Sequence, residues 1–283
     1  MDRKQQHHPA SRQNKKPLIL IKLGGSIITN KEIQEQIRWQ TLRRLIREIA
    51  AARALRTDVQ FVLVHGQGSF AHFPAKKYGV MGGFPFGDEK GRTGMAIVLD
   101  TVNRLNRIIV AECLKAGLPA VSYLASNTVV THSRKQKYFA SDTVEELLRQ
   151  GMMPVSTGDV IVDDVMGCTV WSAEEVLSHT AVDLQKKGWV IQSIVHITET
   201  DGVYDENKHR LDTITPKTVK TLNGAIHKTK GCDVTGGMQL KIQQSLELLH
   251  YGIPSVIVSG KRIGNIQACL SGKKWIGTKI CGD

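Results

Sequence analysis

The stretch FVLVHGQGSFAH (residues 61–72) contains the structural unit from which this chain is built. The run FVLVH is typical of a buried β-strand, the glycines after it predict a tight loop, and the residues beyond the loop can begin a helix. The loop also matches the pattern G-x-G-x-x-A, with Gly66, Gly68 and Ala71 in the fingerprint positions of a dinucleotide-binding unit. His72 follows directly, where such a loop has no need of a histidine.

The same alternation of strand and helix runs along the whole chain. Strands are expected at residues 17–23, 61–66, 119–124, 189–198 and 253–260, and helices at 42–49, 95–116, 141–151, 172–188 and 235–252. Residues 154–172 differ, because their pattern predicts a hairpin that turns near Asp163–Gly167. The sequence therefore predicts an α/β fold with an open, mostly parallel sheet sandwiched by helices, and a β-hairpin near 154–172.

Charge is unevenly distributed along the 283 residues, which carry a net charge of +12. Residues 1–16 hold five Lys or Arg against one Asp and show no apolar period, so we interpret them as a disordered basic tail. The tail has no apolar core typical of a secretory signal, although its composition is also compatible with an organelle transit peptide. Residues 17–283 are expected to form a single domain.

Several classes of protein are disfavoured by composition. The five cysteines show no CxxC spacing, which argues against a zinc site or a disulfide framework and favours a reducing, cytoplasmic compartment. No apolar run approaches the length of a membrane span. Aromatic residues make up 5% of the chain and do not alternate with basic clusters, so the positive charge suits small anionic ligands better than nucleic acid.

The glycine clusters follow the predicted strands, which is where an open α/β sheet binds its ligands. They lie at Gly24-Gly25, Gly66/Gly68, Gly158, Gly202 and Gly260. A dinucleotide site would also require an acidic residue at the end of the next strand, about 20 residues further on. The nearest candidate, Asp88, lies in a glycine-rich segment with no strand to position it. The dinucleotide interpretation therefore fails on context, and the Walker pattern is absent as well.

Two glycine loops carry a lysine each. In KLGGS (22–26) the glycines allow close approach of the backbone to an anion, and Lys22 adds a positive charge. In DVTGGMQLK (233–241) the loop runs into a helix that Thr235 can cap, and Lys241 lies one turn after Gly237. A tight turn with a surface lysine and a capped helix with a solvated lysine are the structural alternatives.

Two further stretches hold polar residues that can serve a ligand. In TETDGVYDENK (198–208), Asp201 can contact a ribose or a metal and Tyr204 can stack on a base, unless the segment is an ordinary surface turn. In WSAEEV (171–176), Glu174 can hold lysines in position, or simply complement the dipole of a helix N-terminus.

Taken together, these stretches resemble the isopentenyl phosphate kinase family of the amino acid kinase superfamily, over nearly the whole chain from residue 17 onward. The resemblance rests on segments that match in order and spacing: KLGGSIITNK (22–31), HGQGSFAHFPAKKYG (65–79), STGDV (156–160), TETDGVYD (198–205) and DVTGGMQLK (233–241). It implies transfer of the γ-phosphoryl group of ATP to isopentenyl phosphate, with Mg²⁺, in isoprenoid biosynthesis. It also implies an N-terminal acceptor lobe, a C-terminal nucleotide lobe and a homodimer.

The resemblance implies a role for each matching residue. Those expected to bind ATP and stabilise the transferred group are Lys22, Gly24, Gly25, Ser26, Lys31, Asp201, Tyr204, Gly237 and Lys241. Those expected around the acceptor phosphate are Gln67, Gly68, His72 and Gly158, while Glu174 would organise the lysines. No residue is assigned as a metal ligand.

The chemistry of the acceptor fits this assignment. A phosphate group with a second pKa of about 6 is largely ionised at neutral pH. It therefore needs a cationic or hydrogen-bonding grip rather than a base, and His72 suits that role.

The chain departs from the family pattern at three places. Gln67 stands where a small residue is usual, Ala71 where glycine is usual, and Ala173-Glu174 where Gly-Asp is usual. Gln67 would either crowd the acceptor phosphate or donate a hydrogen bond to it, and the longer Glu174 would displace the organising contact. The alternatives are therefore a kinase of another small phosphate or phosphonate, such as fosfomycin, and a non-catalytic nucleotide-binding protein.

Overall fold

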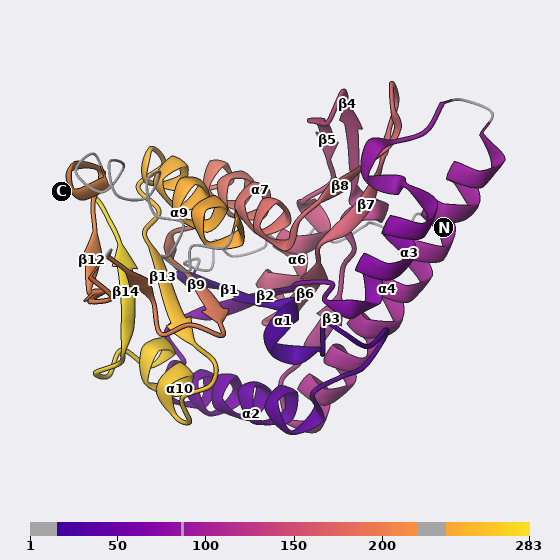
Figure 1. Ribbon diagram of the computed structural model, residues 1–283. Coiled ribbons are helices and arrows are strands. Elements are labelled where there is room, and N and C mark those ends of the chain that lie inside the picture. The colour runs from indigo at the N-terminus through magenta and orange to yellow at the C-terminus, as the bar shows by residue number, and fades with distance from the viewer. Residues whose placement is uncertain (1–15, 86–87, 206, 220–235) are drawn as a thin grey trace, which may run out of the picture.

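A computed structural model describes residues 16–85, 88–205, 207–219 and 236–283 (Figure 1). Its centre is an eight-stranded sheet in the order β12-β14-β13-β9-β1-β2-β6-β3. The strands are β1 (Leu18–Leu23), β2 (Gln60–His65), β3 (Ala120–Ser122), β6 (Met153–Thr157), β9 (Ile191–Thr198), β12 (Thr213–Ile214), β13 (Ser255–Ser259) and β14 (Gly277–Ile280). The β13–β14 pair is antiparallel and the other pairs are parallel, which confirms the predicted fold class.

Helices cover both faces of this sheet (Figure 1). One side is formed by α2 (Trp39–Leu55), α4 (Glu89–Lys115) and α10 (Asn265–Leu270), and the other by α6 (Asp142–Arg149), α7 (Ala173–Lys186) and α9 (Gly236–Leu249). Short helices α1 (Gly25–Ile28), η1 (Val80–Gly82) and α5 (Ala125–Thr128), and the longer α3 (Ser69–Tyr78), are also present. Among the described residues, none of the helices combines the length and apolarity that a membrane span requires.

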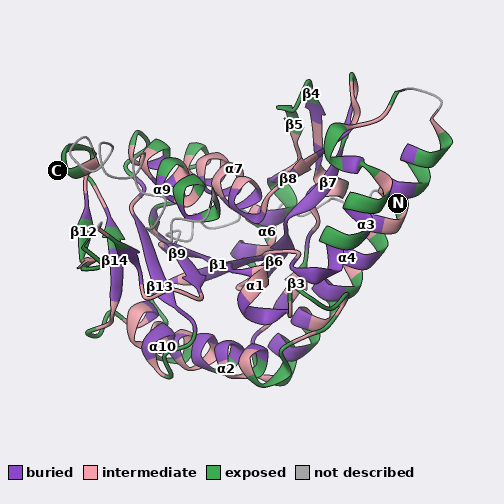
Figure 2. Ribbon diagram, in the orientation of Figure 1, coloured by how far each residue is buried: buried purple, intermediate pink, exposed green. Residues whose placement is uncertain are grey.

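Strand β1 shows why the layers form. All six of its residues are buried (Figure 2). Successive side chains of a β-strand point to opposite faces of the sheet. Ile19, Ile21 and Leu23 contribute to the core beneath α2, α4 and α10. Leu18 and Leu20 contribute to the core beneath α6 and α7. A continuous apolar strand of this kind is typical of a parallel sheet that is covered on both sides.

A second, four-stranded sheet has the order β5-β4-β7-β8. Its strands are β4 (Val129–His132), β5 (Lys135–Phe139), β7 (Asp159–Asp163) and β8 (Gly167–Trp171). A separate two-stranded sheet consists of β10 (Val203–Tyr204) and β11 (Arg210–Leu211). The hairpin predicted for 154–172 is therefore β7–β8, whereas residues 153–157 belong to the main sheet. The carboxylate of Asp163 joins this hairpin to the β4–β5 hairpin, because it accepts hydrogen bonds from the amides of Ser133, Arg134, Val165 and Met166.

Helix α4 begins earlier than its apolar period indicates. Asp88 is its N-cap and accepts a hydrogen bond from the amide of Lys90 at 3.1 Å. The segment GGFPFGDEKG (82–91), interpreted as a glycine-rich loop, thus contains the N-cap and the first residues of the helix. Gly91 has no room for a side chain, because a Cβ there would lie 2.3 Å from Cβ of Phe84. This glycine is a packing residue, and that role has no signature in sequence.

Two predictions fall on residues outside the described ranges. Of the predicted tail, the structure describes Lys16, which donates a hydrogen bond to the carbonyl of Thr57 at 2.7 Å. Thr235, the predicted cap of α9, lies outside the described residues.

Candidate active site

The predicted loops meet at the carboxyl edge of the main sheet. Parallel pairing of β1 with β2 and β9 places Lys22 opposite Val64 on one side and His196 on the other. The residues that follow these strands therefore emerge at one edge, where open α/β sheets bind ligands. Gly158 reaches the same edge from β6, which pairs with β2.

The loops after β1 and β2 touch through their backbones. A Cβ on Gly25 would lie 2.5 Å from the amide nitrogen of Gly68, and one on Gly66 would lie 2.6 Å from the amide nitrogen of Gly25. Any side chain at these positions would separate the loops. Their glycines are therefore required for close approach of one loop to the other, and not only for room around a ligand.

A buried carboxylate holds two lysines at this edge. Oε1 of Glu174 lies 2.6 Å from Nζ of Lys22 and 3.1 Å from Nζ of Lys241. Lys22 is 5% exposed and Glu174 is 8% exposed. Lys241 also donates a hydrogen bond to the carbonyl of Gly237 at 2.9 Å. Three segments far apart in the sequence, β1, α7 and α9, thus bring their charges to one point, and we call these three side chains the lysine–glutamate cluster.

The position of Glu174 is set by the start of α7. Ser172 caps the helix by accepting from the amide of Glu175, and the Glu175 carboxylate accepts from the amide of Ser172 in return. This capping box fixes the first turn, from which Glu174 points to the lysines. The contact expected to be displaced by the longer side chain is therefore present.

Burial and the neighbouring charges shift the pKa values of Glu174 and Lys22 in this cluster. Burial alone would raise the pKa of Glu174, but the positive charges of Lys22 and Lys241 outweigh it and lower the pKa to about 2. Burial is the largest influence on Lys22 and lowers its pKa, against the opposing effect of Glu174. The carboxylate is ionised throughout the physiological range and holds the two ammonium groups side by side.

His72 lies on α3 in the loop region after β2. The residue is exposed. The pKa of His72 is lowered, mainly by partial desolvation of the ring and to a smaller extent by the positive charge of Lys31. Lys31 is thus near enough to His72 for its charge to act on that ring. The segment that carries Lys31 is attached to α4 by two hydrogen bonds from Arg104 to the carboxylate of Glu35, at 2.7 and 2.9 Å.

Gln67 and Gly158 complete the acceptor side. Nε2 of Gln67 is buried and has no hydrogen-bond partner among the described residues. It is therefore a buried donor that no described residue satisfies. A Cβ on Gly158 would lie 2.8 Å from the amide nitrogen of Ala173, so this glycine abuts the start of α7.

Asp201 and Tyr204 line a separate hollow at the same sheet edge. Its volume is about 450 Å³, and it is lined by Glu199, Thr200, Asp201, Tyr204, Ser259, Lys261 and Arg262. A hydrogen bond from Arg262 at 2.5 Å lowers the pKa of Asp201. Tyr204 is 39% exposed, so its ring offers a surface for a planar ligand.

Sequence reasoning missed a buried network next to the acceptor loop. Nδ1 of His65 lies 3.1 Å from the carbonyl of Gly66, and its Nε2 lies 3.1 Å from Nδ2 of Asn106, whose Oδ1 accepts from Ser122 at 2.7 Å. Since the amide of Asn106 can only donate here, Nδ1 of His65 carries the proton. Burial lowers the pKa of His65 to about 4, which keeps the ring neutral.

His196 was also missed. It is 2% exposed, and neither ring nitrogen has a hydrogen-bond partner among the described residues. Burial lowers its pKa to about 3, although the charge of Glu174 opposes that shift. A lone histidine in an apolar strand gives no sequence signal of its surroundings.

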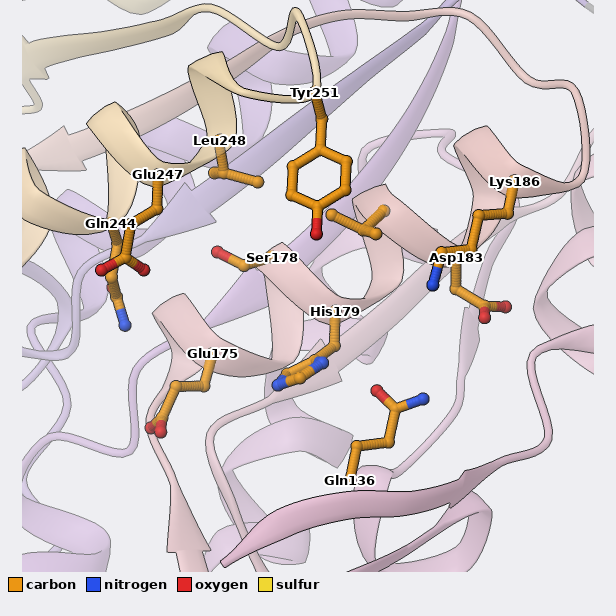
Figure 3. A pocket seen from close by; sticks show the side chains of 11 residues that line it. Gln136, Glu175, Ser178, His179, Asp183, Lys186, Gln244, Glu247, Leu248 and Tyr251 are labelled. Carbon is orange, nitrogen blue, oxygen red and sulfur yellow. The ribbon is translucent and has the colours of Figure 1, made fainter. Parts of the chain in front are cut away.

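A second cavity, of about 500 Å³, lies between α7 and α9 beside β5 (Figure 3). The side chains of Ser178 and His179 from α7 face Glu247 from α9 and Tyr251 from the turn after α9 across it (Figure 3). The ring of His179 stacks on Trp171 with centroids 4.2 Å apart. None of the predicted site residues lines this cavity. Among the described residues there is also no group of three or more His, Cys, Asp or Glu that could hold a metal ion.

The chain is similar to known proteins in both sequence and structure. The model of the amino acid kinase family matches residues 17–259. The chain is 32% identical to an isopentenyl phosphate kinase of Methanothermobacter thermautotrophicus, over 94% of this chain and 99% of the relative. It is 28% identical to an isopentenyl phosphate kinase of Arabidopsis thaliana, over 78% and 72% of the two chains. A solved isopentenyl phosphate kinase structure superimposes with a TM-score of 0.76 at 29% identity, covering 93% of this chain and all of that one.

Proposed function

The chain belongs to the amino acid kinase family, and we propose that it transfers the γ-phosphoryl group of ATP to isopentenyl phosphate, giving isopentenyl diphosphate and ADP. The observation that carries the proposal is the direct contact between the loop at Gly25 and the loop at Gly68. Lys22 of the lysine–glutamate cluster lies just before the first loop, and His72 follows the second loop on α3. Two phosphate groups bound by these loops would therefore lie next to each other, as phosphoryl transfer between them requires.

The nucleotide phosphates would be held by the loop after β1 and the start of α9. Backbone amides at Gly25 and Ser26 can face phosphate oxygens, whereas the amide of Gly24 already donates to the carbonyl of Ile197 and leaves that glycine to line the loop. The N-terminus of α9 at Gly237 adds its positive dipole. Lys22 and Lys241 would neutralise charge that develops during transfer. Their ammonium groups are preorganised by Glu174, so little reorganisation is needed when the reaction occurs.

Lys31 would reach the transferred group from the acceptor side. Its charge acts on His72, which supports placing the two residues at one site. The nucleoside would occupy the hollow lined by Asp201 and Tyr204. In this arrangement the C-terminal part of the chain forms a nucleotide lobe and the N-terminal part an acceptor lobe.

The acceptor phosphate would be held by Gln67, Gly68, His72 and Gly158. His72 and the side-chain amide of Gln67 both offer hydrogen-bond donors, and the Gln67 donor has no protein partner among the described residues. No base is needed, because the acceptor oxygen is already ionised at neutral pH. Gln67 would thus take part in binding.

Mg²⁺ would enter with ATP. This ion prefers water and phosphate oxygens and usually takes only one or two ligands from a protein, so phosphates held at the glycine loops suit it without a cage of side chains. When bound, it neutralises charge on the β- and γ-phosphates. The residues of this chain position those phosphates through the lysine–glutamate cluster.

Isoprenoid biosynthesis in the cytoplasm, by a homodimer, is the cellular setting that we propose from the family resemblance. The four cysteines of the described residues are free, in keeping with a reducing compartment. Sedimentation of the purified protein would report its oligomeric state, and fractionation of cells that express the full chain would test its location.

A kinase of another small phosphate or phosphonate is the second candidate. It is favoured by the side chain of Gln67, which occupies space that a smaller residue would leave to the acceptor. A non-catalytic nucleotide-binding protein is less well supported, because Glu174 contacts both lysines despite its extra methylene group.

Incubation of the purified protein with ATP, Mg²⁺ and isopentenyl phosphate tests the proposal. Formation of ADP and isopentenyl diphosphate in equal amounts is the expected result. Faster turnover of fosfomycin or another small phosphate in a competition assay would support the second candidate. Tight ATP binding without turnover of any acceptor would identify a nucleotide-binding protein. The Lys241→Gln variant serves as the control for contaminating kinases.

A further inference from the structure

Thr29 lies at the junction between the two glycine loops. It follows α1 directly and is that helix's C-cap residue. The residue is fully buried, with 0% exposure, and pairs with Ile37 in an isolated antiparallel bridge. No role in binding or catalysis follows from the family resemblance for this position.

The hydroxyl group of Thr29 contacts both loops. Its Oγ1 donates a hydrogen bond to the carbonyl of Gly25 at 2.8 Å and accepts one from the amide of Ser69 at 3.0 Å. Gly25 belongs to the loop assigned to the nucleotide phosphates. Ser69 is the first residue of α3, the helix that carries His72. One side-chain oxygen therefore joins the donor loop to the acceptor helix.

The start of α3 explains why this oxygen comes from outside the helix. The first amides of a helix have no partner within it and are usually satisfied by a Ser, Thr, Asp or Asn at the N-cap. The N-cap of α3 is Gly68, which has no side chain and a φ of +54°. A Cβ there would lie 2.1 Å from Oγ1 of Thr29. The acceptor helix is thus capped by a residue of the nucleotide loop.

We propose that Thr29 is a positioning residue that fixes the separation of the donor and acceptor phosphates. This inference rests on the proposed function. Loss of the hydroxyl would leave the amide of Ser69 unpartnered and free α3 to shift relative to the loop at Gly25. Phosphoryl transfer is sensitive to such shifts, since a displacement of about 1 Å can slow a reaction about 100-fold.

A pair of variants separates this role from simple packing. Thr29→Val keeps the shape of the side chain and loses both hydrogen bonds, whereas Thr29→Ser keeps the hydroxyl. We expect kcat of Thr29→Val to fall about 10- to 100-fold. Its Kd for a non-hydrolysable ATP analogue and its KM for isopentenyl phosphate should stay close to wild type. Thr29→Ser should recover most of the lost kcat.

Thr180 provides a matched control within the same chain. It is also fully buried, donates from Oγ1 to the carbonyl of Val176 at 2.7 Å and lies 3.0 Å from the hydroxyl of Tyr123. Both Thr29→Val and Thr180→Val should therefore lower Tm by about a few degrees, but Thr180→Val should leave kcat unchanged. Equal loss of kcat in both Val variants, wild-type kcat in Thr29→Val, or failure of Thr29→Ser to recover activity would each overturn the proposal.

Hydrogen exchange distinguishes this inference from the proposed function. Absence of turnover in the wild-type protein would contradict the proposed function alone. The amide of Ser69 can still be followed, because its protection depends on the hydroxyl of Thr29 and not on the substrate. Faster exchange at Ser69 in Thr29→Val than in Thr29→Ser supports the capping contact, and equal exchange in the two variants contradicts it.

Discussion

The ammonium nitrogen of Lys22 lies 2.6 Å from Oε1 of Glu174, although the two residues are 152 positions apart in the chain. The same oxygen lies 3.1 Å from the ammonium nitrogen of Lys241. One carboxylate thus balances two cations at the place where nucleotide phosphates are proposed to bind. Because both Lys22 and Glu174 are buried, their interaction is screened less by solvent than a surface pair would be.

Removal of the Glu174 charge should impair both activity and stability. Glu174→Gln keeps the size of the side chain but leaves two ammonium groups without an anion. We expect kcat to fall about 10- to 100-fold. We also expect the free energy of unfolding at pH 7 to fall by about 3–5 kcal/mol. Steady-state kinetics and urea unfolding measure the two effects.

Glu174→Asp is the matched variant, since it keeps the charge and shortens the side chain by one methylene group. It should retain more stability and more activity than Glu174→Gln. Equal behaviour of the two variants would show that length, and not charge, determines the organisation of the lysines.

Substitution of His72 should act on the acceptor alone. His72→Ala removes a donor from the acceptor side of the site, and we expect kcat/KM for isopentenyl phosphate to fall about 10²- to 10³-fold. Binding of ATP should be unchanged, because the nucleotide is held by other loops. Calorimetry with a non-hydrolysable ATP analogue checks this second point, and an equal loss of ATP affinity would contradict the assigned role.

Gln67 allows a test by charge at constant shape. Gln67→Glu replaces the buried donor by a carboxylate beside the acceptor phosphate, and like charges in contact cost several kcal/mol. KM for isopentenyl phosphate should therefore rise at least 100-fold, to about the limit of measurement. Gln67→Ala, which only removes the donor, should raise KM about tenfold. A lower KM in Gln67→Ala would show instead that the side chain crowds the acceptor.

His196 should make the protein sensitive to acid. The pKa of its ring is about 3 in the folded state, below the ordinary value of 6.5, so it is neutral when folded and protonated when unfolded at intermediate pH. Below pH 6.5 the unfolded state binds a proton that the folded state does not. As the pH falls below 6.5, the free energy of unfolding should therefore decrease by up to about 1.4 kcal/mol for each pH unit, until the pKa of the folded state is reached.

His196→Leu should remove that contribution. It should also raise the free energy of unfolding at pH 7 by about 1–3 kcal/mol, because the buried nitrogens have no partner among the described residues. His65→Leu is the contrasting variant. It should destabilise the protein at pH 7, since it deprives Asn106 of its partner. Urea unfolding between pH 7.5 and 4 compares the two, and an unchanged pH slope in His196→Leu would contradict the assignment.

The fold could be predicted from sequence because its signals are local. The apolar run of β1 and the glycines after β2 each identify an element without reference to the rest of the chain. The predicted start of α4 was wrong, because glycine at positions 91 and 94 is required by side chains from other segments that pack against the helix. A Cβ on Gly91 would meet Phe84 and one on Gly94 would meet Tyr78, and sequence alone interprets such glycines as loop.

The same distinction applies to the candidate site. Lys22 and Lys241 stand beside glycine loops that mark them as candidates, and the structure brings them together through Glu174. Thr29 and His65 could not be identified, because their importance depends on contacts with Ser69 and Asn106 that form only in the folded chain. Assignment of all these residues to steps of the reaction stays a prediction until the variants are measured.

The central place of β1 determines when the sheet can be completed during synthesis. Its first neighbour, β2, ends at His65, but its second, β9, ends only at Thr198. At about 5–20 residues per second, β1 keeps an open edge for roughly ten seconds on the ribosome. An apolar strand with one unpaired edge is a template for aggregation. Fragments that stop before Ile191 should therefore aggregate or recruit chaperones, even though they contain the entire acceptor loop.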